Sequence, residues 1–157
     1  MTRHRPARTY HDDSTWPHLQ LGPHDDRRYF EQLIKAIFQA GLSWPTIESH
    51  WPAFSEVFHD FDPAEVAAMT EHDIDQAAQD PRIIRNRRKV QAAVTSAAAV
   101  NEVIAQYGSL DAYLRSFDSP EKEIADLQHR FAGLGDYSAW WFMQSVGLPV
   151  PPTDPTD

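Results

Sequence analysis

Helix start signals recur at short intervals along the chain, and they constrain the fold more than any other feature. Capping residues precede helical patterns at Ser43, Asp62, Thr70 and Ser119. The side-chain oxygens of these residue types accept amide hydrogens that the first turn of a helix leaves unpaired. Between the signals, apolar residues recur at helical spacing, and no stretch alternates as a strand would. The sequence therefore predicts an all-α fold of about eight short helices.

The start signals and glycine stops also indicate how the chain is divided. We expect longer helices over about 25–40, 44–59 and 136–146, a short turn plus a long helix over 82–106, and short helices after Asp62, Thr70, Gly108 and Ser119. In the helix after Ser119, the predicted buried face carries Ile124, Leu127 and Phe131. Residues 1–9 are expected to be a loose arm, 10–148 a single domain, and 149–157 a proline-rich tail.

Composition limits the partners that such a domain would bind. The chain has 157 residues, no cysteine, and 14 Lys and Arg against 23 Asp and Glu. No apolar run approaches the ~20 residues of a membrane span, and no secretory signal is evident, so we expect a cytoplasmic protein without membrane contact. The acidic excess weighs against nucleic acid as a partner, unless the basic residues gather on one face.

The corner at residues 38–44 (FQAGLSW) places two large apolar side chains where one helix ends and the next begins. Gly41 can close the first helix in a left-handed conformation, and Ser43 can cap the second. Leu42 and Trp44 then have two interpretations. They are core residues beneath the turn, or they form a wedge and wall that insert into something flat, such as a stack of bases.

Two further segments are candidates for phosphate contact. Gly133-Leu134-Gly135 joins two predicted helices and could present backbone amides to a phosphate, although an ordinary interhelical turn has the same pattern. The segment 82–89 (RIIRNRRK) holds five basic residues in an acidic chain. It is either a phosphate-binding patch or a solvated helix face.

Taken in order along residues 10–148, seven segments resemble the bacterial 3-methyladenine DNA glycosylase I family. They are YHD, HDDRRYFE, FQAGLSW, FDPAEVAAM, DPRIIRNRRKVQAA, GSLDAYL and WFMQSVGL. The resemblance implies a helix–hairpin–helix fold and base-excision repair of double-stranded DNA, in which an alkylated purine is flipped into an aromatic pocket and its N-glycosidic bond is hydrolysed.

The resemblance also implies roles for individual residues. Gly41 and Leu42 would fill the gap left in the stack, and Trp44 would stack on the extruded base. Tyr10 would form a pocket wall, Gln39 would lie at the pocket's edge or touch the DNA, and the turn from Gly133 to Gly135 would bind a phosphate. From the residue patterns we also assign Arg85 and Arg87 to DNA contact, and Trp16 and Trp140 to the pocket, with core packing as the alternative for these aromatic side chains.

The sequence departs from the family pattern at sites of chemistry. Ala36 stands where the family has a base-recognising glutamate, and most of the family's zinc ligands are missing, so we expect no metal and no cofactor. Counting from the hairpin to the position of the superfamily's catalytic aspartate reaches Asp154, a candidate catalytic acid. The leading hypothesis is a monomeric glycosylase. A non-catalytic DNA-lesion binder of the same fold and a helical scaffold without a DNA role remain alternatives.

Overall fold

The computed structural model describes residues 19–39 and 43–152, and within these ranges it confirms the all-α prediction. The described chain forms eight α-helices and one short 3-10 helix, with no strand. The elements are α2 (Asp26–Gln39), α3 (Trp44–Val57), η1 (His59–Phe61), α4 (Pro63–Ala67), α5 (Glu71–Gln79), α6 (Arg87–Tyr107), α7 (Leu110–Leu114), α8 (Pro120–Arg130) and α9 (Asp136–Ser145).

The helix starts predicted from sequence are confirmed, because each capping side chain makes its hydrogen bond. Ser43, Asp62, Thr70 and Ser119 accept an amide hydrogen from the following turn at 3.0–3.4 Å. At α5 the bond is reciprocal, since the Thr70 amide donates to the Asp73 carboxylate at 2.9 Å. Such caps stabilise a helix by about 1 kcal/mol each, which matters for helices as short as these.

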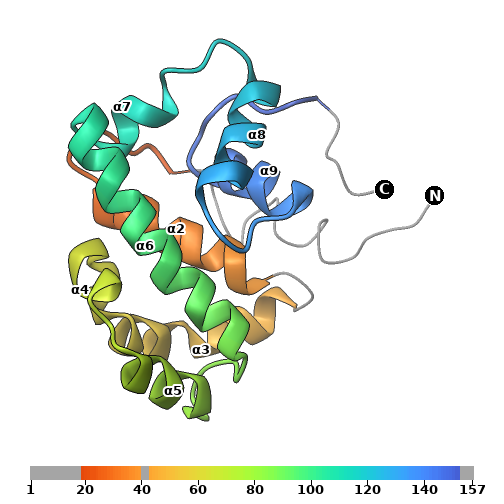
Figure 1. Ribbon diagram of the computed structural model, residues 1–157. Helices are drawn as coiled ribbons and strands as arrows, with labels where there is room; N and C mark the ends of the chain where they lie inside the picture. Colours follow the sequence, from red (N-terminus) through yellow and green to blue (C-terminus); the bar gives the residue numbers. More distant parts are fainter. Residues whose placement is uncertain (1–18, 40–42, 153–157) are drawn as a thin grey trace.

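Two helices, α2 and α6, hold the rest of the fold together (Figure 1). α6 packs against α2, α4, α5 and α7, while α2 also contacts α3, α7 and α9. The helices α3–α5 lie on one side of this pair and α7–α9 on the other. The core between them is rich in aromatic side chains, and its largest fully buried members include Trp141, Tyr29, Tyr113, Phe30, Phe38, Phe54 and Phe58. No helix of the described chain is long and apolar enough to cross a membrane.

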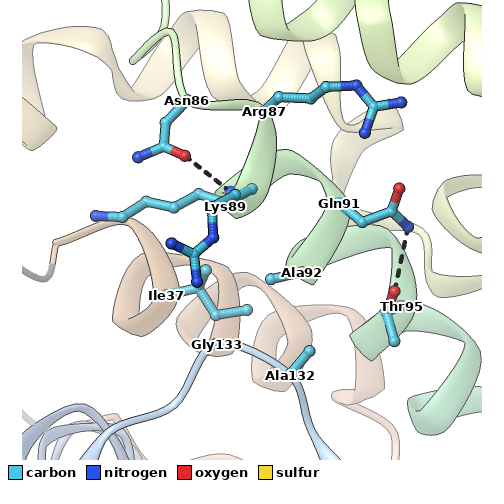
Figure 2. Close-up of a pocket in the computed structure, with 10 residues that line it drawn as sticks. Ile37, Asn86, Arg87, Lys89, Gln91, Ala92, Thr95, Ala132 and Gly133 are labelled. Carbon is cyan, nitrogen blue, oxygen red and sulfur yellow. Dashed lines mark hydrogen bonds between the residues drawn. The ribbon is translucent and has the colours of Figure 1, made fainter.

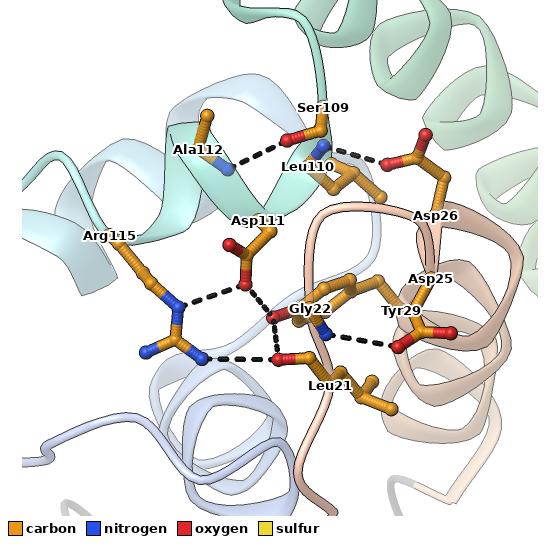
Figure 3. A network of polar contacts seen from close by, with 10 residues as sticks. All are labelled: Leu21, Gly22, Asp25, Asp26, Tyr29, Ser109, Leu110, Asp111, Ala112 and Arg115. Atoms are coloured by element: carbon orange, nitrogen blue, oxygen red, sulfur yellow. Dashed lines mark hydrogen bonds and ion pairs between the residues drawn. The ribbon is translucent and has the colours of Figure 1, made fainter.

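A buried polar network fixes the first turn of α2 to α7 (Figure 3). The Tyr29 hydroxyl donates to the Asp111 carboxylate at 2.6 Å, and Arg115 Nε donates to the same carboxylate at 2.9 Å. The Leu110 amide donates to Asp26 Oδ1 at 2.8 Å. Burial, and then the bond to Asp111, raise the pKa of Tyr29 well above its usual value, so the hydroxyl remains a donor. One end of α2 is thereby anchored, and the other end leads into residues 40–42.

The expected end of the helix over 44–59 is wrong. α3 ends at Val57, and His59, Asp60 and Phe61 follow with φ values of 53°, 57° and 61°. This left-handed turn contains no glycine, so it requires support from its surroundings. Ser55 Oγ donates to Asp60 Oδ1 at 2.6 Å, and Arg27 donates to the Asp60 carbonyl oxygen at 3.3 Å. Phe61, which is 5% exposed, also anchors the turn in the core.

The predicted buried face of α8 also needs correction. Leu127 and Phe131 are buried as expected, but Ile124 is only partly buried. Glu123 is buried instead, with 4% of its surface exposed. Positions 123 and 124 both lie about one turn before Leu127 on the same face, so apolar spacing alone does not decide which of the two is buried more deeply.

Candidate nucleic-acid interface

A groove of about 630 Å³ opens between the end of α2, the first turns of α6 and the loop that joins α8 to α9 (Figure 2). Two residues that the sequence assigns to DNA contact, Arg87 and Gly133, line this one groove although they are far apart in sequence. The complete lining is Ile37, Asn86, Arg87, Arg88, Lys89, Gln91, Ala92, Thr95, Ala132 and Gly133.

The first turn of α6 places positive charge on this groove. Asn86 caps the helix, and its Oδ1 accepts the amide hydrogen of Lys89 at 3.1 Å. Residues 87–89 are all basic, and the first turn holds no acidic residue. The N-terminus of a helix already carries partial positive charge, so this arrangement disfavours the isolated helix by a few tenths to about 1 kcal/mol per charge. The same arrangement favours binding of an anion.

Two residues of the basic segment are held by carboxylates. Arg87 Nε lies 2.7 Å from Asp75 Oδ1, and Arg87 Nη2 lies 2.6 Å from Glu71 Oε1. Figure 2 shows its guanidinium pointing away from Gly133. Arg82 pairs in the same way with two acidic side chains. Both residues fit the interpretation of a salt-bridged helix face, and a DNA contact by Arg87 stays a prediction.

Three other cations of the segment differ from these two. Arg85 and Arg88 are exposed, and neither forms an ion pair with a residue that the structure describes. Lys89 is half-buried, and its Nζ donates to the carbonyl oxygen of Phe38 at 3.2 Å. Burial lowers the pKa of Lys89. The sequence alone does not single out Arg88 and Lys89, because only the fold decides which members of a basic run face the groove.

The loop between α8 and α9 needs glycine at one position only. Gly133 has φ +84°, and a Cβ there would lie 3.0 Å from Ala92 Cβ and 3.3 Å from Ile37 Cγ2. The turn therefore packs directly against both α6 and α2. Gly135 has φ −87° and an open surrounding, and it precedes α9 without a side-chain cap. Within the described chain, the first amides of α9 are thus not capped by a side chain.

The end of α2 contains the position at which the resemblance places base recognition. Ala36 is fully buried, and it offers no side-chain hydrogen bond. Gln39, the last residue of α2, is 4% exposed, and its Nε2 has no hydrogen-bond partner in the described part of the chain. An unpaired buried donor costs about 1–3 kcal/mol, so this amide is suited to a ligand that offers an acceptor.

Lys35, beside Ala36 on α2, is a buried cation that sequence reasoning missed. Its side chain is 5% exposed, and its Nζ lies 5.1 Å from the centroid of the Trp51 ring. Burial lowers the pKa of Lys35 to about 8, against the opposing effects of Glu31 and Glu48. In the sequence, the only feature that draws attention to Lys35 is Glu31, which lies one turn before it on the same helix face.

The remaining predicted site residues are not brought together by the described structure. Trp140 is buried in α9, where its Nε1 donates to the Pro151 carbonyl oxygen at 3.2 Å. Its ring stacks on Tyr137 with the centroids 5.9 Å apart. Trp44 is the first residue of α3. The predicted positions Tyr10, Trp16, Gly41, Leu42 and Asp154 lie outside the described residues.

The described residues hold no group of three or more His, Asp or Glu side chains that could bind a metal ion. The sequence has no cysteine, so thiolate ligands are excluded throughout the chain. The expectation of no metal and no cofactor stays a prediction, because residues 1–18, 40–42 and 153–157 lie outside the described ranges.

Comparison with known sequences gives a consistent result. A family model described as methyladenine glycosylase matches residues 1–133. The DNA-3-methyladenine glycosylase of Haemophilus influenzae is 29% identical over 160 residues, which cover 88% of this chain and 84% of that protein. DNA-3-methyladenine glycosylase 1 of Escherichia coli is 43% identical over 75 residues, which cover 48% of this chain and 40% of the relative.

Comparison with solved structures extends the similarity over nearly the whole chain. A variant of 3-methyladenine DNA glycosylase I in complex with 3-methyladenine superposes with a TM-score of 0.75 at 28% identity, covering 98% of this chain and 95% of that one. A variant of the enzyme from Staphylococcus aureus gives 0.76 at 28% identity, with 97% and 94% covered.

Proposed function

Because the chain belongs to the methyladenine glycosylase family, we propose that it is a DNA glycosylase that removes alkylated purines from double-stranded DNA. The observation that carries the proposal is the groove, which brings the basic start of α6, the Gly133 turn and the end of α2 together. The turn and the exposed guanidinium groups suit a phosphate backbone, which dominates affinity for DNA. A DNA substrate also fits the expected cytoplasmic location, and we propose that the protein acts as a monomer.

The corner at residues 38–44 would act on the bases while the groove holds the backbone. Leu42, with Gly41 beside it, would fill the space that an extruded purine leaves in the stack. Trp44 and Tyr10 would stack on the extruded base, and an electron-rich aromatic pocket attracts a cationic base. Alkylation at N3 makes adenine cationic, so this pocket would favour the alkylated base over the normal one.

The reaction requires little from the protein beyond orientation and exclusion of water. Water attacks C1′ of the sugar, the C1′–N bond breaks, and the bonding electrons neutralise the positive charge on the departing base. The attacking water loses its proton. Because the leaving group departs neutral, one oriented water in a closed pocket could suffice. The described residues of α2 contribute Gln39 to this pocket in our proposal.

Asp154 is the proposed general base, whose carboxylate would take the proton that the attacking water loses, and the assignment rests on its spacing from the hairpin. Wild type and Asp154→Asn should be compared for base release under single-turnover conditions. We expect the asparagine variant to lose activity by about 10²–10⁴-fold, the usual contribution of a positioned acid or base. Equal rates would remove Asp154 from the mechanism without affecting the wider proposal.

The proposal itself is tested by incubating the protein with methylated duplex DNA and measuring release of 3-methyladenine and 7-methylguanine. We expect 3-methyladenine to be released faster than from DNA alone. The second candidate function, lesion binding without catalysis, is favoured by Ala36 at the position of the family glutamate. It predicts no release but salt-dependent binding. A slope near zero of log affinity against log salt would contradict both functions.

A further inference from the structure

We propose that Lys89 is a positioning residue, which holds the end of α2, at Phe38 and Gln39, in register with the Gly133 turn. The inference rests on the proposed glycosylase function. In the sequence, Lys89 and the neighbouring arginines form one basic segment. The proposal gives Lys89 a different role from those arginines.

The first observation is the bond from Lys89 to the end of α2. Its Nζ donates to the carbonyl oxygen of Phe38 at 3.2 Å. Phe38 is the penultimate residue of α2, so its carbonyl is one of the four that the helix cannot satisfy internally. A cation at this end also complements the helix dipole. Gln39 follows Phe38 directly, so the bond fixes the backbone beside this proposed pocket residue.

The second observation is that Lys89 is built into the protein rather than extended to solvent. It is half-buried, and its own backbone amide is held by the Asn86 cap at 3.1 Å. Burial lowers the pKa of Lys89, which indicates that the ammonium gives up hydration to reach this place. Arg88, its neighbour on the same groove, is exposed and forms no ion pair with a described residue.

The third observation is that the same face of α6 also contacts the glycine turn. Ala92 lies one turn after Lys89, and its Cβ is 3.0 Å from the position that a Cβ on Gly133 would occupy. Ile37, next to Phe38 on α2, approaches the same point at 3.3 Å. One turn of α6 therefore touches the end of α2 through Lys89 and the proposed phosphate-binding turn through Ala92.

Loss of the Lys89 ammonium should therefore affect base extrusion more than DNA affinity. The exposed guanidinium groups and the turn would still bind the DNA backbone, while the end of α2 would no longer be held relative to it. A displacement of about 1 Å at a reacting centre can reduce a rate by about 10²-fold. A side chain that binds phosphate behaves differently, because removing its charge lowers the salt slope of DNA binding by about 0.9.

The test compares Lys89→Met, which keeps the length of the side chain, with Lys89→Arg and with Arg88→Gln as the matched groove variant. We expect Lys89→Met to lower the single-turnover rate of base release by about 10- to 100-fold at saturating enzyme, with an unchanged salt slope. The Lys89→Arg variant keeps a cation at this position, so it should retain most of the wild-type rate of base release. Arg88→Gln should weaken binding and lower the salt slope by about 0.9.

Hydrogen exchange of the free protein provides a readout that does not depend on activity. We expect faster exchange over residues 38–44 in Lys89→Met, with the amides of α8 unchanged and with a cooperative urea transition that shows a folded chain. Unchanged exchange over 38–44 would overturn the proposal even if wild type releases no base. A lowered salt slope with a wild-type saturated rate would overturn it as well, because Lys89 would then be a phosphate ligand.

Discussion

Glu123 is a buried acid without a hydrogen-bond partner for one oxygen, and its ionisation should make stability depend on pH. It is 4% exposed, and its Oε2 is unpaired within the described chain. Burial raises the pKa of Glu123 from its ordinary 4.5 to about 8, with Arg115 opposing this effect and Asp126 adding to it. At neutral pH the side chain is therefore mostly a neutral carboxylic acid in the folded protein.

The sign and size of the effect follow from linkage. The folded chain binds this proton more tightly than the unfolded chain, so stability falls as the pH rises above about 4.5 and stops falling above about 8. At about 1.36 kcal/mol for each unit between the two pKa values, the full loss is on the order of 5 kcal/mol. This is a large share of the ~5–15 kcal/mol that stabilises a typical domain.

Glu123→Gln removes the titration while keeping the shape of the side chain. In urea unfolding, we expect the stability of the variant relative to wild type to increase by about 4 kcal/mol between about pH 5 and pH 9. Effects of the amide itself do not depend on pH and cancel in this comparison. Glu121→Gln, at an exposed position of the same helix, is the matched control and should show no such trend. A difference between Glu123→Gln and wild type that stays constant with pH would refute the reasoning.

The other predictions concern the groove and the base pocket. Gly133→Ala should destabilise the fold by about 2–5 kcal/mol in urea unfolding, from its left-handed backbone and the 3.0 Å contact, while Gly135→Ala should change stability by less than about 0.5 kcal/mol. Ala36→Glu should raise 3-methyladenine release by roughly 5- to 12-fold over Ala36→Gln, which has similar size but can form only a neutral hydrogen bond. Arg87→Gln should change the salt slope of DNA binding less than Arg88→Gln, because the guanidinium of Arg87 is already bonded to two carboxylates.

Local signals allowed the secondary structure to be predicted well. The capping oxygens of Ser43, Asp62, Thr70 and Ser119 act within three residues of their own position, so the pattern contains all the information needed. The left-handed turn at residues 59–61 depends on Arg27, which lies far away in sequence, and no local pattern indicates it.

The candidate site was only partly predictable, because pairing across helices decides which charges are available. Arg87 and Arg88 are adjacent in the sequence, have the same side chain and both line the groove. Arg87 forms ion pairs with Asp75 and Glu71, whereas Arg88 forms no ion pair within the described chain. Burial of a charged residue is equally non-local. Glu123 is buried while Ile124 is only partly buried, although both precede Leu127 by about one helical turn, so packing against the rest of the fold decides between them.

These pairings leave the acidic chain with few cations in this segment for the proposed DNA substrate. Carboxylates neutralise Arg82 and Arg87, and Lys89 bonds the end of α2, which leaves Arg85 and Arg88 as the cations of this segment for phosphate. Two such contacts correspond to a salt slope of only about −1.8. Binding by this segment would therefore be weak and would offer little discrimination between damaged and normal DNA. Recognition would then depend on the non-ionic contacts of the corner with the bases, so holding that corner in register becomes more important than adding charge to the groove.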